Sequence, residues 1–278
     1  MNGVDVFYIN LARATQRRQA IEQSYADSRF SSSWRLNRFE AIDASSDEVR
    51  HRQGPVINAL KANWLSHMGC AKSALARGLT SHILIAEDDT EFSPVTEYWV
   101  NGILNNVDPT QWDVLYLDAF ITNAVDMPWF FKARAKCFRE TSVGILPLFK
   151  FPRDFAGAGS YIVNNSQLRR FVEMCDLGFI PIAFDLYLRK LVTDGFLKGF
   201  MTYPFLTTVA KTGDLSQVQY AEERVTQDVV INAFRRLVWM GAGPPNEELA
   251  PGETIITKDV QAFQGIFSKL LTMQLGWL

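Results

Sequence analysis

Short apolar runs that alternate with helical patterns constrain the fold of this chain more than any other feature. His82–Ala86 reads His-Ile-Leu-Ile-Ala and is apolar on both faces, and Asp113–Leu117 follows a similar pattern. Strands of this kind are typical of the interior of a parallel sheet. Val4–Asn10 is a further run of strand-forming residues. The alternation predicts an α/β fold with a mostly parallel central sheet, in which ligands bind at the carboxyl ends of the strands.

Amphipathic patterns predict the helices of this fold. Between Asn58 and Arg77, one helical face carries Leu60, Trp64, Met68, Ala71 and Leu75. Gly78 follows, at a position where a helix C-terminus favours glycine. The other predicted elements are a helix over Thr15–Tyr25, a strand over Arg38–Ile42, and helices over Ser166–Cys175, Pro181–Val192 and Val225–Met240. The aromatic-rich segment Asn123–Arg153 is predicted to be irregular.

The composition excludes several classes of protein. The chain has 278 residues, with 28 Lys and Arg against 30 Asp and Glu, and this near-neutral balance argues against nonspecific nucleic-acid binding. Cys70, Cys137 and Cys175 form no CxxC pair, and the three histidines show no HExxH spacing. A disulfide scaffold and a zinc site are therefore not expected. The length allows one large domain or two modest ones.

The sequence shows no pattern of a membrane-spanning helix or a signal peptide. The N-terminus reads as a first strand, and no run of about 18 uncharged apolar residues occurs. We therefore expect a cytoplasmic protein. A predicted helix over Val260–Leu271 has one apolar face, which is expected to pack within the chain. A homo-oligomer contact through the C-terminal helices and peripheral association with the inner face of a membrane are the alternatives.

The apolar run Ile83–Ala86 is followed by three consecutive carboxylates, Glu87, Asp88 and Asp89. Like charges packed together cost free energy unless a cation or hydrogen-bond donors offset them. Mg²⁺ and Mn²⁺ prefer carboxylate oxygens and commonly share them with substrate phosphates. The motif therefore indicates a site for a divalent cation and a nucleoside diphosphate. An acidic loop exposed to solvent is the alternative interpretation.

A group of arginines follows the first predicted strand. Arg13, Arg17 and Arg18 come after Asn10, where a helix is predicted to begin. Arginine binds phosphate oxygens in a bidentate manner and the helix end adds N–H donors, although each arginine could equally lie on a solvent-exposed face. Asp43, past the next predicted strand, could accept hydrogen bonds from a ribose or a base edge, or close an Asx turn.

Two further features have structural interpretations. His67 lies beside the apolar face of a predicted helix, where a lone histidine is usually a hydrogen-bonded core or boundary residue. Gly157 and Gly159 supply two glycines of a nucleotide-binding pattern, but no complete GxGxxG, P-loop or GxSxG motif is present. These glycines are expected instead to permit close approach of the backbone.

In combination, these segments resemble glycosyltransferase family 25, which includes lipooligosaccharide β-galactosyltransferases and collagen galactosyltransferases. The matching segments follow the family's order: Phe7–Leu11 with Arg17 and Arg18, Glu40–Asp43, Leu65–His67, Ile85–Asp89, Trp112–Leu117, Gly159–Val163 and Pro181–Asp185. The resemblance spans about residues 4–220. It implies a GT-A-like fold over residues 1–220, with 221–278 as a helical C-terminal extension that packs on this domain or at a subunit interface.

The resemblance also implies a reaction, the inverting transfer of galactose or glucose from a UDP-sugar to a carbohydrate acceptor such as lipooligosaccharide. Asp185 would be the base that takes the proton of the acceptor hydroxyl, or else only a helix N-terminal carboxylate. His67 would order the acidic turn, which consists of Glu87, Asp88 and Asp89. The binding residues would be Glu87, Asp88 and Asp89 for Mn²⁺ or Mg²⁺, Arg13, Arg17 or Arg18 for phosphate, and Asn10 and Asp43 for the nucleoside.

Two other functions fit the same residues. A metal-dependent nucleotidyltransferase or phosphotransferase would use the carboxylates on a different bond. A non-catalytic scaffold or carbohydrate-binding protein could retain a degenerate transferase fold. The second alternative rests on departures from the family pattern, because Asp43 is followed by Ala44 rather than glycine and Ala59–Trp64 contains no glycine.

Overall fold

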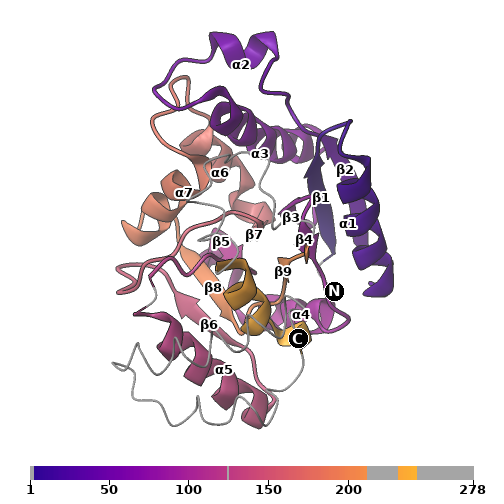
Figure 1. The fold of residues 1–278 in the computed structure, drawn as a ribbon, viewed down its shortest axis with the longest axis vertical. Coiled ribbons are helices and arrows are strands. Elements are labelled where there is room, and N and C mark those ends of the chain that lie inside the picture. Colours follow the sequence, from indigo (N-terminus) through magenta and orange to yellow (C-terminus); the bar gives the residue numbers. More distant parts are fainter. Residues whose placement is uncertain (1–2, 124, 212–230, 243–278) are drawn as a thin grey trace, which may run out of the picture.

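The computed structural model describes residues 3–123, 125–211 and 231–242. Within these residues, a central sheet of seven strands has the order β2-β1-β3-β7-β5-β8-β6 (Figure 1). The strands are β1 (Val4–Asn10), β2 (Trp34–Glu40), β3 (His82–Glu87), β5 (Val114–Tyr116), β6 (Gly144–Pro147), β7 (Ser160–Val163) and β8 (Gly199–Tyr203). β7 and β6 run antiparallel to their neighbours, and the other strands share one direction. The predicted α/β fold with a mostly parallel sheet is confirmed.

Helices cover both faces of this sheet. The α-helices are α1 (Thr15–Asp27), α2 (Asp47–His51), α3 (Asn58–Ala76), α4 (Thr96–Asn106), α5 (Met127–Glu140), α6 (Leu168–Cys175) and α7 (Phe184–Thr193). Short 3-10 turns cover Pro109–Gln111, Asn165–Gln167 and Met240–Ala242, and a separate two-stranded sheet pairs β4 (Thr90–Glu91) with β9 (Thr208–Val209). Helices α6 and α7 both contact α3 (Figure 1).

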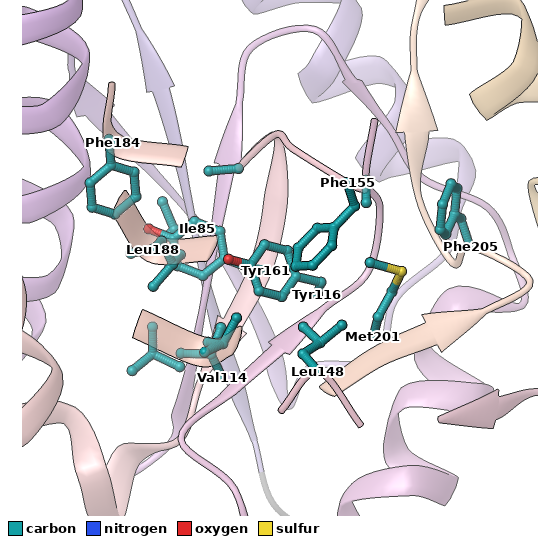
Figure 2. Close-up of a cluster of buried hydrophobic side chains, with 14 of the residues drawn as sticks. Ile85, Val114, Tyr116, Leu148, Phe155, Tyr161, Phe184, Leu188, Met201 and Phe205 are labelled. Carbon is teal, nitrogen blue, oxygen red and sulfur yellow. The ribbon is translucent and has the colours of Figure 1, made fainter. Parts of the chain in front are cut away.

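The alternation of side chains along β3 divides the core between these two helical layers. Ile83 and Ile85 belong to a cluster that includes residues of α3, α6 and α7, whereas Leu84 and Ala86 pack with residues of α1 and α4. Figure 2 shows part of the first cluster, in which Ile85 lies close to Tyr161 and to Phe184 of α7. A strand buried on both faces requires the continuous apolar run that the sequence shows.

The register of the sheet brings several strand ends to one edge. Ile9 of β1 is paired with Glu87 of β3, and β2 ends level with β1. The antiparallel strand β7 begins beside the same edge, since Ser160 is paired with Ala86. The acidic residues after β3 therefore lie beside the residues that follow β1 and those that precede β7.

The segment Asn123–Arg153 is not irregular, and that prediction was wrong. It contains α5 and β6. Phe130, Phe131 and Arg134 of α5 are buried, and Pro128 stands at the start of the helix, where proline is favoured. The dense aromatic residues therefore belong to an amphipathic helix that packs against β8.

The boundaries of other predicted elements also change. The second strand covers Trp34–Glu40 rather than Arg38–Ile42. Helix α7 begins at Phe184 rather than at Pro181, because Ala183, its N-cap residue, is still extended. The long helix α3 is confirmed, and Gly78 follows its end with a φ of 61°, a conformation that favours glycine.

The residues 231–242 pack into the core of the sheet domain. Residues 231–237 are helical, as predicted, and Phe234 and Val238 are fully buried in the cluster that contains α3 and α7. Residues 238–240 do not continue the predicted helix Val225–Met240, and Met240 begins a 3-10 turn. The part of that helix before residue 231 and the predicted helix Val260–Leu271 lie outside the described residues, and the division at residue 220 stays a prediction. The described helices include none with the length and apolar character required to cross a membrane.

Close packing of α7 on β8 generates a stability prediction. A Cβ atom added at Gly199 would lie 2.6 Å from Cβ and Cγ1 of Val192, so Gly199→Ala is expected to lower the free energy of unfolding by about 1–3 kcal/mol. The matched control is Gly102→Ala in α4, where no atom lies within 4 Å and a gain of up to about 1 kcal/mol is expected. Urea denaturation measures both, and equal effects would contradict the packing argument.

Candidate functional site

Asp88 connects the end of β3 to the start of α1. Its Oδ2 accepts a hydrogen bond from Nδ2 of Asn10 at 2.7 Å, and its Oδ1 accepts one from Nη1 of Arg17 at 3.0 Å. Both oxygens of this buried carboxylate are therefore occupied by partners from other elements. The side chain of Asn10 has further partners, because its Nδ2 also donates to the carbonyl of Ala14 and its Oδ1 accepts a hydrogen bond from Arg38.

Arg17 lies between two of the three consecutive carboxylates. Its Nη1 is 3.0 Å from Oδ1 of Asp88 and 3.3 Å from Oδ2 of Asp89. Burial opposes the charged form of the guanidinium, but the carboxylates of Asp89 and Asp88 outweigh this effect and raise the pKa of Arg17. The cation therefore offsets part of the repulsion at the strand end.

Glu87 is held from the side of α3, while it remains close enough to Asp89 for its charge to act on that carboxyl. Its Oε1 accepts a hydrogen bond from Nδ2 of Asn63 at 2.9 Å and lies 3.6 Å from Nε2 of His67. Burial would raise the pKa of Glu87, but His67 and Asn63 lower it overall. Asn63 and His67 of α3 therefore orient the side chain of Glu87.

His67 is a buried residue that supports Glu87. Its ring stacks on Phe184 with centroids 4.5 Å apart, and Nδ1 lies 3.1 Å from the hydroxyl of Tyr161. The side chain has no exposed surface, so it acts through its neighbours and not on a ligand. The position of His67 agrees with the expectation of a hydrogen-bonded core histidine, and its role in ordering the acidic turn stays a prediction.

Asp89 is the least compensated of the carboxylates. Burial and the charge of Glu87 raise its pKa to about 6, against the opposing effect of Arg17 and Arg235. Its Oδ2 faces Arg17, whereas Oδ1 accepts no hydrogen bond from any described residue. This carboxylate therefore retains an oxygen that a ligand could use.

Asp185 lies at the N-terminus of α7, close to this group. Its Oδ2 accepts a hydrogen bond from the backbone N–H of Gly157 at 3.0 Å. Burial raises the pKa of Asp185, and the charge of Glu87 adds to the rise. Asp185 is therefore close enough to the acidic turn for the charge of Glu87 to act on it.

The remaining candidates lie farther out. Asp43 pairs with Arg13 at the surface, and its Oδ1 accepts from the backbone and the hydroxyl of Ser45 at 2.8 and 2.7 Å. These bonds to Ser45 and Arg13 hold the pKa of Asp43 well below its usual range, and they establish the Asx turn. Arg18 forms an i,i+4 pair with Glu22 on α1 and does not contact the acidic turn.

One pair of site residues was missed in the sequence. Asp118 follows β5, and Arg235 comes from the segment 231–242; the two form a buried ion pair beside the acidic turn. A Cβ at Gly159 would lie 3.2 Å from Nη2 of Arg235, which explains the close approach expected of this glycine. The position of Asp118 after an apolar run was a signal, but nothing in the sequence pointed to Arg235.

Glu87, Asp88 and Asp89 do not form a site with three metal ligands, because Asp88 is engaged by Asn10 and Arg17. Within the described ranges, no three His, Cys, Asp or Glu side chains are grouped as metal ligands. Asp88 uses both oxygens elsewhere, whereas Oε2 of Glu87 and Oδ1 of Asp89 accept no hydrogen bond from the described residues. Their side chains are 34% and 18% exposed, so a ligand can reach them. Two such carboxylates suit a cation that is shared with substrate phosphates.

Comparison with known proteins gives a consistent result. Residues 4–188 match a family model described as "Glycosyltransferase family 25 (LPS biosynthesis protein)". A protein of Acanthamoeba polyphaga mimivirus that carries the name "Putative glycosyltransferase R655" is 25% identical over 187 residues, which cover 62% of this chain and 53% of the viral protein. The chain thus spans about half the length of that relative.

A solved structure aligns along nearly the whole chain but only distantly. The crystal structure of the glycosyltransferase GlyE from Streptococcus pneumoniae TIGR4 aligns with 99% of this chain and 64% of its own, at 9% identity and a TM-score of 0.38. At that score, the likeness adds no support to the fold or the activity.

The environment of Asp89 leads to a prediction for the metal-free protein. A carboxyl with a pKa of about 6 in the folded state and about 3.9 in the unfolded state binds more protons when folded, so stability falls as pH rises from about 4 to 6. Asp89→Asn should remove this loss and raise the free energy of unfolding at pH 7 by about 2 kcal/mol, with little difference at pH 4.

Urea denaturation at a series of pH values measures the effect. The control is Asp47→Asn, which changes an exposed aspartate on α2 and should follow the wild-type curve. A difference between Asp89→Asn and wild type that is constant across the series would contradict this account of the Asp89 environment.

Proposed function

The chain belongs to glycosyltransferase family 25, and we propose that it transfers galactose or glucose from a UDP-sugar to a hydroxyl of a carbohydrate acceptor such as lipooligosaccharide, with inversion. The observation that carries the proposal is the acidic turn after β3, where Glu87 and Asp89 keep open oxygens while Asp88 is tied into the fold. A rigid turn with two available carboxylates is suited to a metal-bound diphosphate.

On the donor side, Arg17 is positioned to contact the diphosphate, because it already lies between Asp88 and Asp89. Arg13 and Asp43 stand at the more exposed rim, where Asp43 could accept hydrogen bonds from the nucleoside. The amide of Asn10 is committed to Asp88 and Ala14, so we assign it the role of holding the acidic turn. The nucleoside contact then falls to Asp43.

Glu87 and Asp89 would hold a divalent cation, Mn²⁺ or Mg²⁺. When bound, such a cation neutralises the negative charge that develops on a nucleoside diphosphate leaving group. The contribution of the chain is to fix the two carboxylates, through Asn63 for Glu87 and through Arg17 for Asp89. Asp88 stabilises the turn without ligating the ion.

Asp185 is the proposed base. An inverting displacement needs a group on the acceptor side that takes the hydroxyl proton as the new bond forms. The Gly157 N–H fixes one oxygen of Asp185, and burial raises the pKa of the carboxyl toward the working pH of a base. The charge of Glu87 acts on the same carboxyl, which supports a location facing the donor site.

A thermal-shift panel tests the donor assignment. UDP, UDP-galactose and UDP-glucose, each with and without Mn²⁺, should stabilise the protein by about 2.7 kcal/mol at one hundred times the dissociation constant. Glu87→Gln and Asp89→Asn should each remove the Mn²⁺-dependent part of the shift, and Glu173→Gln on the exposed face of α6 should retain it.

The products of turnover separate the proposal from its rivals. Release of UDP with a glycosylated acceptor supports sugar transfer, whereas release of pyrophosphate would support a nucleotidyltransferase. A protein that binds no UDP species would contradict the donor assignment and favour a non-catalytic role.

Substitution of the proposed base should separate binding from chemistry. Asp185→Asn removes the proton acceptor with little change in shape, so kcat should fall by about 10²- to 10⁴-fold while UDP affinity stays near the wild-type value. Asp194→Asn at the other end of α7, where Asp194 pairs with Lys190, is the matched control and should leave kcat unchanged. Loss of affinity without loss of kcat would assign Asp185 to binding.

A further inference from the structure

The buried ion pair of Arg235 and Asp118 lies beside the acidic turn, and neither residue is among the predicted site residues. A Cβ at Gly159 would lie 3.2 Å from Nη2 of Arg235, and the carbonyl of Gly159 accepts a hydrogen bond from the backbone N–H of Glu87 at 2.8 Å. Nε of Arg235 lies 3.1 and 3.0 Å from the two oxygens of Asp118, and Nη2 also donates to Oδ2. The guanidinium lies 4.2 Å from the centre of the Phe120 ring. Arg235 stands outside the residues 4–188 that match the family, so its role is not covered by the resemblance.

Arg235 is placed to act through Asp118 and not on a ligand directly. Nη1 donates to Oδ1 of Asn232 at 2.9 Å, so each guanidinium nitrogen is engaged within the chain. The side chain is only 4% exposed. A ligand at the acidic turn could therefore contact Arg235 only if the ion pair opened.

The charge of this pair nevertheless reaches the proposed donor site. Arg235 favours the ionised forms of Glu87 and Asp89 and thereby acts to lower the pKa of both carboxyls, while Glu87 acts on Asp118 as a like charge. Without Arg235, Asp118 would add an uncompensated negative charge beside the two open carboxylates. A diphosphate carries negative charge as well, so an additional carboxylate would oppose its binding.

We propose that Arg235 is a positioning residue of the donor site: by holding both oxygens of Asp118, it keeps this carboxylate from repelling the diphosphate and thereby sets the affinity for the donor. The inference rests on the proposed UDP-sugar function and deepens it. The segment 231–242 thus contributes to the donor site through the contact of Arg235 with Asp118.

A double-mutant cycle tests this role. Arg235→Met removes the cation and leaves an unbranched apolar side chain in its place, and it should weaken UDP binding by about tenfold, because one buried negative charge becomes uncompensated. Asp118→Asn combined with Arg235→Met removes both charges and should restore UDP affinity to within about threefold of wild type. Isothermal titration with UDP and Mn²⁺ measures affinity, and circular dichroism confirms that each variant is folded.

Two further variants serve as controls. Arg153 also pairs with an aspartate, Asp126 at 2.6 Å, and lies 4.4 Å from an aromatic ring, that of Trp129. Arg153→Met therefore removes a similar pair at another place and should leave UDP affinity unchanged. Asp118→Asn alone should not weaken UDP binding, because it removes negative charge.

The possible outcomes separate the inference from the proposed function. A double variant that binds UDP as weakly as Arg235→Met would show that Arg235 contacts the donor or only holds the fold, and would overturn the inference. Wild-type affinity in Arg235→Met would overturn it as well, with the UDP-sugar function intact. If the wild-type protein binds no UDP species, both the role of Arg235 and the UDP-sugar function would be overturned.

Discussion

The repulsion among three consecutive carboxylates is the constraint around which the site is arranged. Each carboxylate at the end of β3 has different surroundings: Glu87 contacts α3, Asp88 is held by β1 and α1, and Asp89 lies beside Arg17. The contacts that relieve the repulsion therefore also join β3 to the neighbouring elements. The cost of packing like charges is offset by groups that determine the shape of the turn.

Most of the fold could be predicted from the sequence, because buried strands and helices require apolar residues at characteristic spacings. β3 requires an unbroken apolar run, and α3 requires apolar residues at helical spacing, so both were recognised. The prediction of an irregular segment missed α5, because dense aromatic residues hide the helical spacing of Phe130, Phe131 and Arg134 on one face. The antiparallel direction of β7 left no local signal, since register and direction depend on distant partners.

The candidate site was predictable only where its residues follow one another in the chain or end neighbouring strands. Glu87, Asp88 and Asp89 were identified together, but sequence alone could not show that Asp88 would be used by Asn10 and Arg17. Arg235 follows Asp118 by 117 residues, and no periodicity connects them. Gly159 suggested that some group approaches closely, yet the identity of that group required the folded chain.

The position of β8 shows that the central sheet extends beyond the residues that match the family. The family match ends at residue 188, whereas β8 covers Gly199–Tyr203 and lies between β5 and β6. A fragment cut at the end of the match would leave β6 without its hydrogen-bonded neighbour and expose one edge of β5. The end of the family match and the end of the folded sheet are therefore different, and an expression fragment should include the whole sheet.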